Sequence, residues 1–268
     1  MSRFFFMTPP KFKSFSLILS LVLSISSASF AGEGMEQLIQ SRLSKDGKLL
    51  DLSGMRIGSK GAKVLSGMVL LSGVETLLLQ GNKIGYRGVK ALAKSPQAAN
   101  LKHLDLWGNL VGDLGLKALS ESPYLKNLEI LKLWKNEIGD ESLELMVQSD
   151  NFRQVKTLML NDNLVTPAGA GYLASPDIFP ELETLNLFRN EIGDQGALTL
   201  ARSKPFQNLK SLYLGQNNLS DIGAVALIKS KSFPRLETLD MVKNHLGEKT
   251  LVAAFKYNKE GKLQIITR

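Results

Sequence analysis

The chain contains no cysteine among its 268 residues, and this absence excludes several classes of protein. No disulfide can stabilise the fold, and no thiol can serve as a nucleophile. A lipoprotein anchor is excluded as well, because no cysteine follows the apolar run near the N-terminus. Stability must therefore come from a packed core, for which a chain of this length is large enough.

Histidine is almost as scarce, with only His103 and His245 in the whole chain. Neither has a second metal-type ligand at a recognisable spacing, and no serine nucleophile accompanies His103 and Asp105. No phosphate-binding glycine loop is present either, since Gly169-Ala170-Gly171 fits helix packing. The sequence therefore predicts no catalytic residue, no metal site and no cofactor.

Long apolar runs are also missing. The run from Phe15 to Ile25 is too short to cross a bilayer comfortably. It follows Arg3, Lys11 and Lys13, and it precedes Ser29-Phe30-Ala31, whose small residues stand where a signal peptidase reads. This order is typical of a secretory signal, so we expect residues 1–31 to be a signal peptide that is cleaved, leaving no membrane span. A retained N-terminal anchor is the alternative.

The excess of positive charge is small. The formal net charge is +8, from 33 basic and 25 acidic residues. Loss of the three basic residues in the signal segment leaves 30 basic against 25 acidic residues, or +5. This surplus is spread along the chain without a basic run or an RNA-binding motif. The sequence therefore predicts no nucleic-acid partner.

What the chain does contain is a repeat. Asparagine recurs every 27 residues at seven positions. These are Asn82, Asn109, Asn136, Asn163, Asn190, Asn217 and Asn244. One step further back, Met55 takes the same place in a unit that keeps the rest of the pattern. Eight units therefore occupy about residues 47–261, and a fixed period of this size indicates a solenoid.

Each unit combines a strand with a helix. Leucine stands five places before the asparagine, and leucine or methionine stands three places before it, as in a short strand with one buried face. Beyond the asparagine, residues such as Ile84, Val89 and Leu92 follow helical spacing. Thr166 and Pro167 suit the N-cap and first position of a helix. Four units place an aspartate just after this cap, where the helix dipole favours a carboxylate.

The frame L-x-x-L-x-L-x-x-N-x-I-G-x-x-G-x-x-x-L, which residues 74–92 carry as VETLLLQGNKIGYRGVKAL, resembles the leucine-rich repeat family. The closest type is that of ribonuclease inhibitor and NOD-like receptors, and the resemblance covers about four fifths of the chain. It implies a right-handed α/β horseshoe of about eight 27-residue strand–turn–helix repeats. A parallel sheet would line its concave face. Export without cysteine favours a bacterial protein, because eukaryotic ectodomains of this family usually carry disulfide-bonded caps.

Both ends of the array should be covered, because open solenoid ends expose apolar residues. An amphipathic stripe predicts a capping helix within residues 32–46. Its apolar members are Met35, Leu38, Ile39 and Leu43. At the other end, residues 262–268 are expected to form an incomplete ninth strand, with Leu263 and Ile266 in phase with the repeats.

Two repeated features receive a structural interpretation. We expect the asparagines to be buried and to bond backbone groups that the turns leave open. Seven places before each asparagine position, the charge alternates in sign through all eight units. The series is Lys48, Glu75, Lys102, Glu129, Lys156, Glu183, Lys210 and Glu237. Because neighbouring parallel strands lie about 4.8 Å apart, these side chains should pair across strands and help to fix the register.

The residues between the buried leucines should face outward on the concave side. Trp107 and Trp134, the only two tryptophans, fall at the same outward position of neighbouring units. The other outward apolar residues are Leu78, Met159, Phe188 and Tyr213, and the charged residues around them are Asp105, Lys132, Lys135 and Arg189. Several exposed aromatic side chains together reach the size of an interaction patch. We therefore expect a partner-binding site with an aromatic centre and a charged rim.

These observations predict a non-catalytic, monomeric scaffold that is periplasmic or secreted and holds a protein or peptide on its concave face. A glycan or cell-envelope ligand is one alternative, since tryptophan faces also stack on sugars. Another is a structural envelope protein without a specific ligand. In that case the aromatic side chains would only stiffen the sheet.

Overall fold

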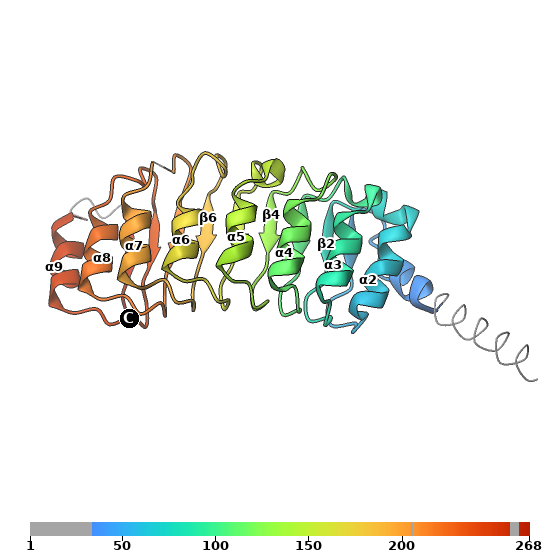
Figure 1. Cartoon of the computed structure of the whole chain (residues 1–268), viewed down its shortest axis with the longest axis horizontal. Helices are drawn as coiled ribbons and strands as arrows, with labels where there is room; N and C mark the ends of the chain where they lie inside the picture. The colour runs from blue at the N-terminus through green and yellow to red at the C-terminus, as the bar shows by residue number, and fades with distance from the viewer. Residues whose placement is uncertain (1–33, 205, 258–262) are drawn as a thin grey trace, which may run out of the picture.

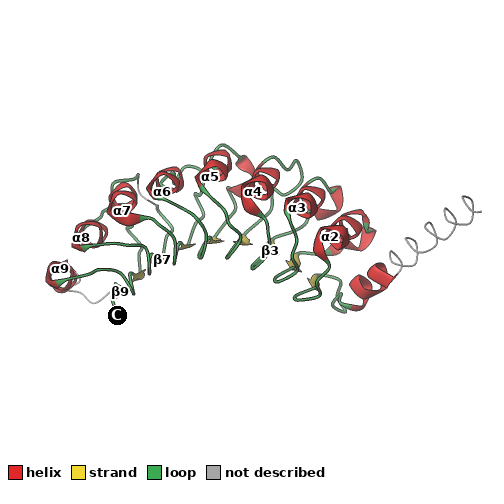
Figure 2. Ribbon diagram, turned by 60° about the horizontal axis from the view of Figure 1, so that its bottom comes forward, coloured by secondary structure: helices red, strands yellow, loops and turns green. Residues whose placement is uncertain are grey.

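The computed structural model describes residues 34–204, 206–257 and 263–268. The expected signal peptide lies outside these residues. The described part is a curved solenoid, with strands along the concave side and helices along the convex side (Figures 1 and 2). This architecture confirms the horseshoe that the repeat frame predicted.

The nine strands of the described residues form a single parallel sheet in chain order. They are β1 (Leu49–Asp51), β2 (Thr76–Leu78), β3 (His103–Asp105), β4 (Ile130–Lys132), β5 (Thr157–Met159), β6 (Thr184–Asn186), β7 (Ser211–Tyr213), β8 (Thr238–Asp240) and β9 (Gln264–Ile266). From β1 to β8, each residue pairs with the one 27 positions later, so that Leu50 aligns with Leu77 and Leu77 with Leu104. The period of the sequence is therefore the register of the sheet.

The last strand departs from this register. Ile265 aligns with Leu239, and Ile266 aligns with Asp240, so the final step is 26 residues long. The expectation that Ile266 continues the core row is wrong, because a shift of one residue exchanges the two faces of a strand. Ile265 packs against the core instead, and Leu263 also packs there, as expected. The segment before β9 is one residue shorter than its counterparts, and the earlier units could not reveal that.

Helices cover the convex side of the described part. They are α2 (Gly58–Gly67), α3 (Tyr86–Ala93), α4 (Gly112–Ser120), α5 (Asp140–Met146), α6 (Pro167–Leu173), α7 (Gly193–Ala201), α8 (Asp221–Ile228) and α9 (Glu248–Tyr257). In the part of the chain that the structure describes, three short 3-10 helices each lie between a helix and the next strand: η1 (Val69–Gly73), η2 (Pro96–Ala98) and η3 (Asp150–Phe152). At the N-terminal end, residues 34–41 form a further helix that buries Ile39. Leu43 then pairs antiparallel with Leu50 at the first edge of the sheet.

Apolar side chains from strands and helices fill the space between the two layers. The strand leucines, such as Leu50, Leu77 and Leu131, have no exposed surface. A column of phenylalanines extends this core through the later repeats, at intervals of 27 residues: Phe152, Phe179, Phe206 and Phe233. The last two rings stack with their centroids 6.1 Å apart. Strand and helix periodicity did not predict this column, because its members lie in the connections.

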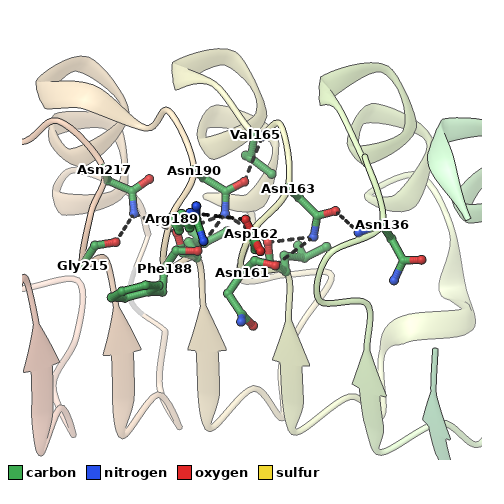
Figure 3. Close-up of polar contacts among 12 residues, drawn as sticks. Asn136, Asn161, Asp162, Asn163, Val165, Phe188, Arg189, Asn190, Gly215 and Asn217 are labelled. Atoms are coloured by element: carbon green, nitrogen blue, oxygen red, sulfur yellow. Dashed lines mark hydrogen bonds and ion pairs between the residues drawn. The ribbon is translucent and has the colours of Figure 1, made fainter. Parts of the chain in front are cut away.

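The asparagines connect each repeat to its neighbours. Asn82 Nδ2 donates to the carbonyl oxygens of Leu79, at 2.9 Å, and of Leu52 in the preceding repeat, at 2.7 Å. Asn82 Oδ1 accepts from the N–H of Ile57 at 3.2 Å. Similar bonds recur along the array, and Figure 3 shows them around Asn163 and Asn190. The structural interpretation of these residues is confirmed, since each amide satisfies backbone groups that water cannot reach.

The aspartates near the helix starts also bridge repeats. Asp113 Oδ1 accepts from the N–H of Gly139 at 2.8 Å. In later units the aspartate at the same position accepts from a backbone N–H at the start of the next helix. Asp140 accepts from Thr166 at 3.0 Å, Asp194 from Ser220 at 2.8 Å and Asp221 from Gly247 at 2.8 Å. Each carboxylate therefore caps the helix of the following repeat, a partner that the spacing along one unit could not indicate.

The predicted charge ladder forms ion pairs, although not as a continuous row. Glu75 lies between Lys48 and Lys102, with Nζ–O distances of 2.8 and 2.9 Å. Two separate pairs follow, Lys156 with Glu129 at 2.8 Å and Lys210 with Glu183 at 2.9 Å. Glu237 has no ion pair within the described residues. The hydrogen bonds from Lys102 and Lys48 lower the pKa of Glu75 from 4.5 to about 2.

Replacement of a buried ladder asparagine should destabilise the array more than replacement of a partly exposed one. Asn136→Ala removes the bonds to the N–H of Val111 and to the carbonyl oxygens of Leu106 and Trp134. The loss is expected to be about 2–4 kcal/mol in the free energy of unfolding, because these backbone groups stay buried without partners. Asn244→Ala should cost about 1 kcal/mol, since water can replace part of the lost bonding. Urea denaturation of both variants tests this, and equal losses would contradict it.

The ion pairs of Glu75 should make a pH-dependent contribution to stability. Because its folded-state pKa lies near 2 instead of 4.5, the contribution is complete above pH 4.5 and is lost as the pH falls through 2. Glu75→Gln should therefore lower the melting temperature slightly at neutral pH and low salt, with the difference vanishing in acid or high salt. Glu237→Gln is the matched control and should have a smaller effect. A difference for Glu75→Gln that persists at pH 2 would contradict this assignment.

Candidate ligand-binding surface

The register of the sheet places two rows of side chains on the concave face. Leu104 and Leu131 point into the core, so the residues that follow them in each strand point outward. Asp105 aligns with Lys132, which aligns with Met159 in the next strand. Two residues beyond each strand, the same arrangement brings equivalent side chains of successive repeats side by side.

Trp107 and Trp134 form a stacked pair in the second of these rows. Their ring centroids are 4.7 Å apart, and the ring planes differ by 18°. This distance equals the spacing of about 4.8 Å between parallel strands, so the rings face one another across adjacent repeats. In the flanking repeats, the places that correspond to the two tryptophans are held by Gln80 and Asn161. The stack covers one face of each ring, and the two residues are 40% and 39% exposed.

The tryptophan pair lies in a shallow groove of about 590 Å³ on the concave face. Seven of the ten predicted site residues line it: Asp105, Trp107, Lys132, Trp134, Met159, Phe188 and Tyr213. The other lining residues are Gln80, Asn161 and Asn186, which the site prediction omitted. They occupy the same outward rows as the aromatic residues, so the register alone could have found them. The groove thus combines aromatic and amide side chains with only two charged groups.

The sequence predicted that Asp105 belongs to an exposed charged rim. The structure shows otherwise, because only 4% of its surface is exposed. Its Oδ1 accepts from the N–H of Trp107 at 3.0 Å, and its Oδ2 lies 3.5 Å from Lys132 Nζ. The carboxylate therefore holds the backbone of Trp107 and the ammonium of Lys132. The same bond, in which a side-chain Oδ1 accepts from the backbone N–H two residues later, occurs in three other repeats of the described chain. There Asp51 accepts from Ser53, Asn186 from Phe188 and Asp240 from Val242.

Three predicted site residues lie apart from the groove. Lys135 and Arg189 directly follow outward residues, but their φ angles of 55° and 57° show that the turn has begun, which redirects their side chains. Lys135 lines a separate depression of about 440 Å³. Arg189 Nε lies 3.5 Å from Asp162 Oδ1 in the same region (Figure 3). Leu78 is half-buried and aligns with Asp105, outside the groove lining.

Phe188 is seated on the backbone of the next repeat. A Cβ atom at Gly215 would lie 2.6 Å from two ring carbons of Phe188, so glycine is required for this contact. Figure 3 shows the ring directed toward Gly215. Phe188 is consequently half-buried and in a fixed orientation, with the rest of its surface available to the groove.

His103 lies on β3 beside the groove. Burial and the nearby Lys132 ammonium lower its pKa, and the Asp105 carboxylate opposes them. His103 Nε2 and Gln80 Oε1 are buried polar atoms without a hydrogen-bond partner among the described residues. The described residues contain no group of three or more histidine and acidic side chains that could hold a metal ion. None of their helices is long and apolar enough to cross a membrane.

Four segments of the chain match a family model described as Leucine Rich repeat, namely residues 74–93, 97–120, 181–201 and 207–227. These segments coincide with strand–helix units of the single parallel sheet. The fold is a leucine-rich repeat solenoid. A search of curated proteins finds no match to this chain.

A search of solved structures finds chains that are similar to this one at low sequence identity. The ectodomain of the Arabidopsis receptor kinase HAESA, in complex with an extended IDA peptide hormone, is 21% identical over 81% of this chain, with a TM-score of 0.48. A second HAESA complex, with the peptide hormone and a co-receptor, is 23% identical over 74% of this chain, with a TM-score of 0.45. An internalin from Listeria monocytogenes is 20% identical over 81%, with a TM-score of 0.46. The chain spans 33%, 30% and 57% of these three chains, respectively.

Loss of the Asp105 carboxylate should disturb the tryptophan pair. Asp105→Ala removes the acceptor for the Trp107 N–H, at a cost of about 1 kcal/mol. Stacked indoles give an exciton signal in circular dichroism, and we expect this signal to weaken in the variant. The Trp134→Phe variant has no indole pair and therefore shows the spectrum expected without the exciton signal. Asp240→Ala removes the equivalent bond to Val242 and should leave the signal unchanged. An intact signal in Asp105→Ala would show that the carboxylate does not position Trp107.

Proposed function

We propose that this leucine-rich repeat solenoid is a non-catalytic scaffold that binds a protein or peptide on its concave face. The observation that carries the proposal is the pair of stacked, partly exposed tryptophans in an aromatic and amide-lined groove. Aromatic residues of this kind dominate the binding energy of protein interfaces, because they bury a large area at a small cost in side-chain entropy.

The groove offers an apolar anchor point and separate polar groups. A ligand side chain seated on the edges of Trp107 and Trp134 would also reach Met159, Phe188 and Tyr213. The amides of Gln80, Asn161 and Asn186 can bond the polar atoms of a peptide, since each amide carries both donors and an acceptor. Lys132 supplies a positive charge that Asp105 partly neutralises. Apolar area would thus provide affinity, and the amides would fix orientation.

The orientation of the indole rings favours a peptide over a sugar. A sugar ring stacks on the face of an aromatic ring, but the facing sides of Trp107 and Trp134 cover each other. Gln80 and Asn161 hold the corresponding places in the flanking repeats. The exposed edges carry a partial positive charge, which suits carbonyl oxygens or the face of a ligand aromatic ring. A glycan or cell-envelope ligand is therefore the weaker alternative.

A protein partner larger than the groove would extend over the turn edge of the horseshoe. There it would meet Lys135 and Arg189, with Glu137 and Asp162 beside them. This mixed set of charges would form the outer rim of the interface, where ion pairs affect association rate and specificity more than affinity. We further propose that binding takes place outside the cytoplasm, on the strength of the N-terminal signal pattern.

The test begins with identification of the ligand. The protein is used as bait with envelope and culture extracts, and in parallel with a random peptide library and a glycan array. For each ligand found, affinity is then measured for Trp107→Ala combined with Trp134→Ala. We expect a peptide or protein ligand whose affinity falls at least about tenfold in the double variant, because a buried aromatic anchor is worth about 2 kcal/mol or more.

The matched control is Val69→Ala combined with Leu114→Ala, which removes two apolar side chains that are 76% and 60% exposed away from the groove. This control should bind normally, and circular dichroism should show that both variants keep the fold. Unchanged affinity in the tryptophan variant would refute the site. Glycan binding that the tryptophan variant abolishes would favour the glycan alternative, and no ligand from any source would favour a structural envelope protein.

A further inference from the structure

Basic side chains gather on the convex side of the first two repeats. In the repeats of α2 to α5, the fifth, eighth and twelfth residues after the ladder asparagine, or after Met55 in the first repeat, are exposed and form the outward face of the helix. Five of the six such residues in the repeats of α2 and α3 are basic, and none is acidic. These five residues, called the basic patch below, are Lys60, Lys63, Arg87, Lys90 and Lys94.

Stacking of the repeats brings the basic patch together, although the sequence contains no basic run. Lys60 and Lys63 stand 27 residues before Arg87 and Lys90, and α2 packs directly against α3. Arg87 Nε donates to Tyr86 Oη at 3.1 Å. No residue of the patch forms an ion pair with another described residue. The positive charge of the patch is therefore not neutralised within the described part of the chain.

This grouping of like charges opposes folding. Lys90 has Arg87 three residues before it and Lys94 four residues after it, and like charges at these spacings destabilise a helix. The repeat frame does not impose the charge, because the same places on α5 hold Glu141 and Glu144. The charges at the strand starts behave differently, since they alternate in sign and pair between repeats. Packing does not require the exposed basic patch, and its self-repulsion indicates a partner of opposite charge.

Acidic side chains lie at the borders of the basic patch. In α2, α3 and the chain between them, the only acidic residue is Glu75, which is already held in two ion pairs on the strand side. On the neighbouring α4, Glu121 Oε1 lies 3.8 Å from Lys117 Nζ. Glu36, on the helix of residues 34–41, lines a depression at the C-terminal end of α2. The outward faces of α2 and α3 themselves remain wholly basic.

The shape of this face favours a flat partner. The helices form the outer curve of the solenoid (Figure 2), so a plane can touch only a few neighbouring helices, and the patch covers two neighbours. Leu114 holds on α4 the place that Lys60 and Arg87 hold on α2 and α3, and it is 60% exposed. Basic residues beside an exposed apolar side chain are typical of surfaces that bind anionic lipid. Four of the five basic residues are lysines, which attract phosphate as point charges without the fixed geometry of a bidentate contact.

We propose that the basic patch docks this protein on a membrane surface that contains anionic phospholipid, with the lysines against the headgroup phosphates. The concave groove then faces away from the membrane and stays accessible to its ligand. Docking uses residues outside that groove, so this proposal and the proposed function can fail separately. Because the attraction is electrostatic, salt should weaken it.

The test combines Lys60→Gln, Lys63→Gln, Lys90→Gln and Lys94→Gln in the full chain. These side chains are exposed, so circular dichroism should show an unchanged fold. Binding is measured by co-sedimentation with vesicles of phosphatidylcholine alone, and with vesicles of equal parts phosphatidylcholine and phosphatidylglycerol. We expect the wild type to bind the anionic vesicles at least about tenfold more tightly than the variant at low salt, because each cation near an anionic surface adds to the attraction.

The matched control removes the same charge from exposed lysines outside the patch, and it should bind the anionic vesicles like the wild type. It combines Lys126→Gln, Lys231→Gln, Lys243→Gln and Lys249→Gln. Absence of binding to the anionic vesicles, or equal binding by the patch variant and the control, would overturn the proposal. Equal binding of the wild type to neutral vesicles would also overturn it, because the apolar N-terminal segment would then account for the association. Tighter binding to duplex DNA or to polyglutamate than to anionic vesicles would assign the patch to another polyanion.

The tryptophans report which face meets the membrane. Trp107 and Trp134 are the only tryptophans of the chain, and they lie on the concave side. Brominated lipids in the anionic vesicles should therefore leave the fluorescence of the bound protein unchanged. Strong quenching would place the concave face on the membrane and would contradict docking through α2 and α3.

Discussion

The bonds that the ladder asparagines make between successive repeats are the interaction on which the rest of the structure depends. A three-residue strand followed by a tight turn leaves backbone groups facing the core, where no water can reach them. Asn136 satisfies such groups in its own repeat and in the repeat before it, and its own N–H is bonded by Asn163. A repeat can therefore satisfy its polar atoms only in contact with its neighbours, which makes the array cooperative.

This constraint fixes the register, and the register places the candidate site. One repeat stacks on the next at strand spacing, so Trp107 and Trp134 lie side by side, and their rings stack with centroids 4.7 Å apart. The stack covers one face of each ring, which bears directly on the ligand chemistry proposed for the groove. Asp105 adds a local restraint, because its carboxylate holds both the backbone of Trp107 and the ammonium of Lys132.

The burial of the helix residues follows from the same rule. Interior repeats cover one another, so the helix residues that face the next repeat, such as Leu116 and Ala224, are fully buried. Among the described residues, the first and the last repeat have a neighbouring repeat on one side. The chain covers one of them with the helix of residues 34–41 and the bridge at Leu43, whereas Leu251 and Phe255 leave the other apolar.

By itself, the sequence determined the repeat length, the alternation of strand and helix, the buried role of the asparagines and the outward placement of the tryptophans. All of these are periodic, and a period is visible without coordinates. The tertiary structure decided what depends on distance and direction between repeats. It buried Asp105, turned Lys135 and Arg189 away from the groove through their positive φ angles, and shifted β9 by one residue. A one-dimensional frame holds neither the direction of a side chain after a turn nor the length of the closing segment, because both are set by packing against the neighbouring repeat.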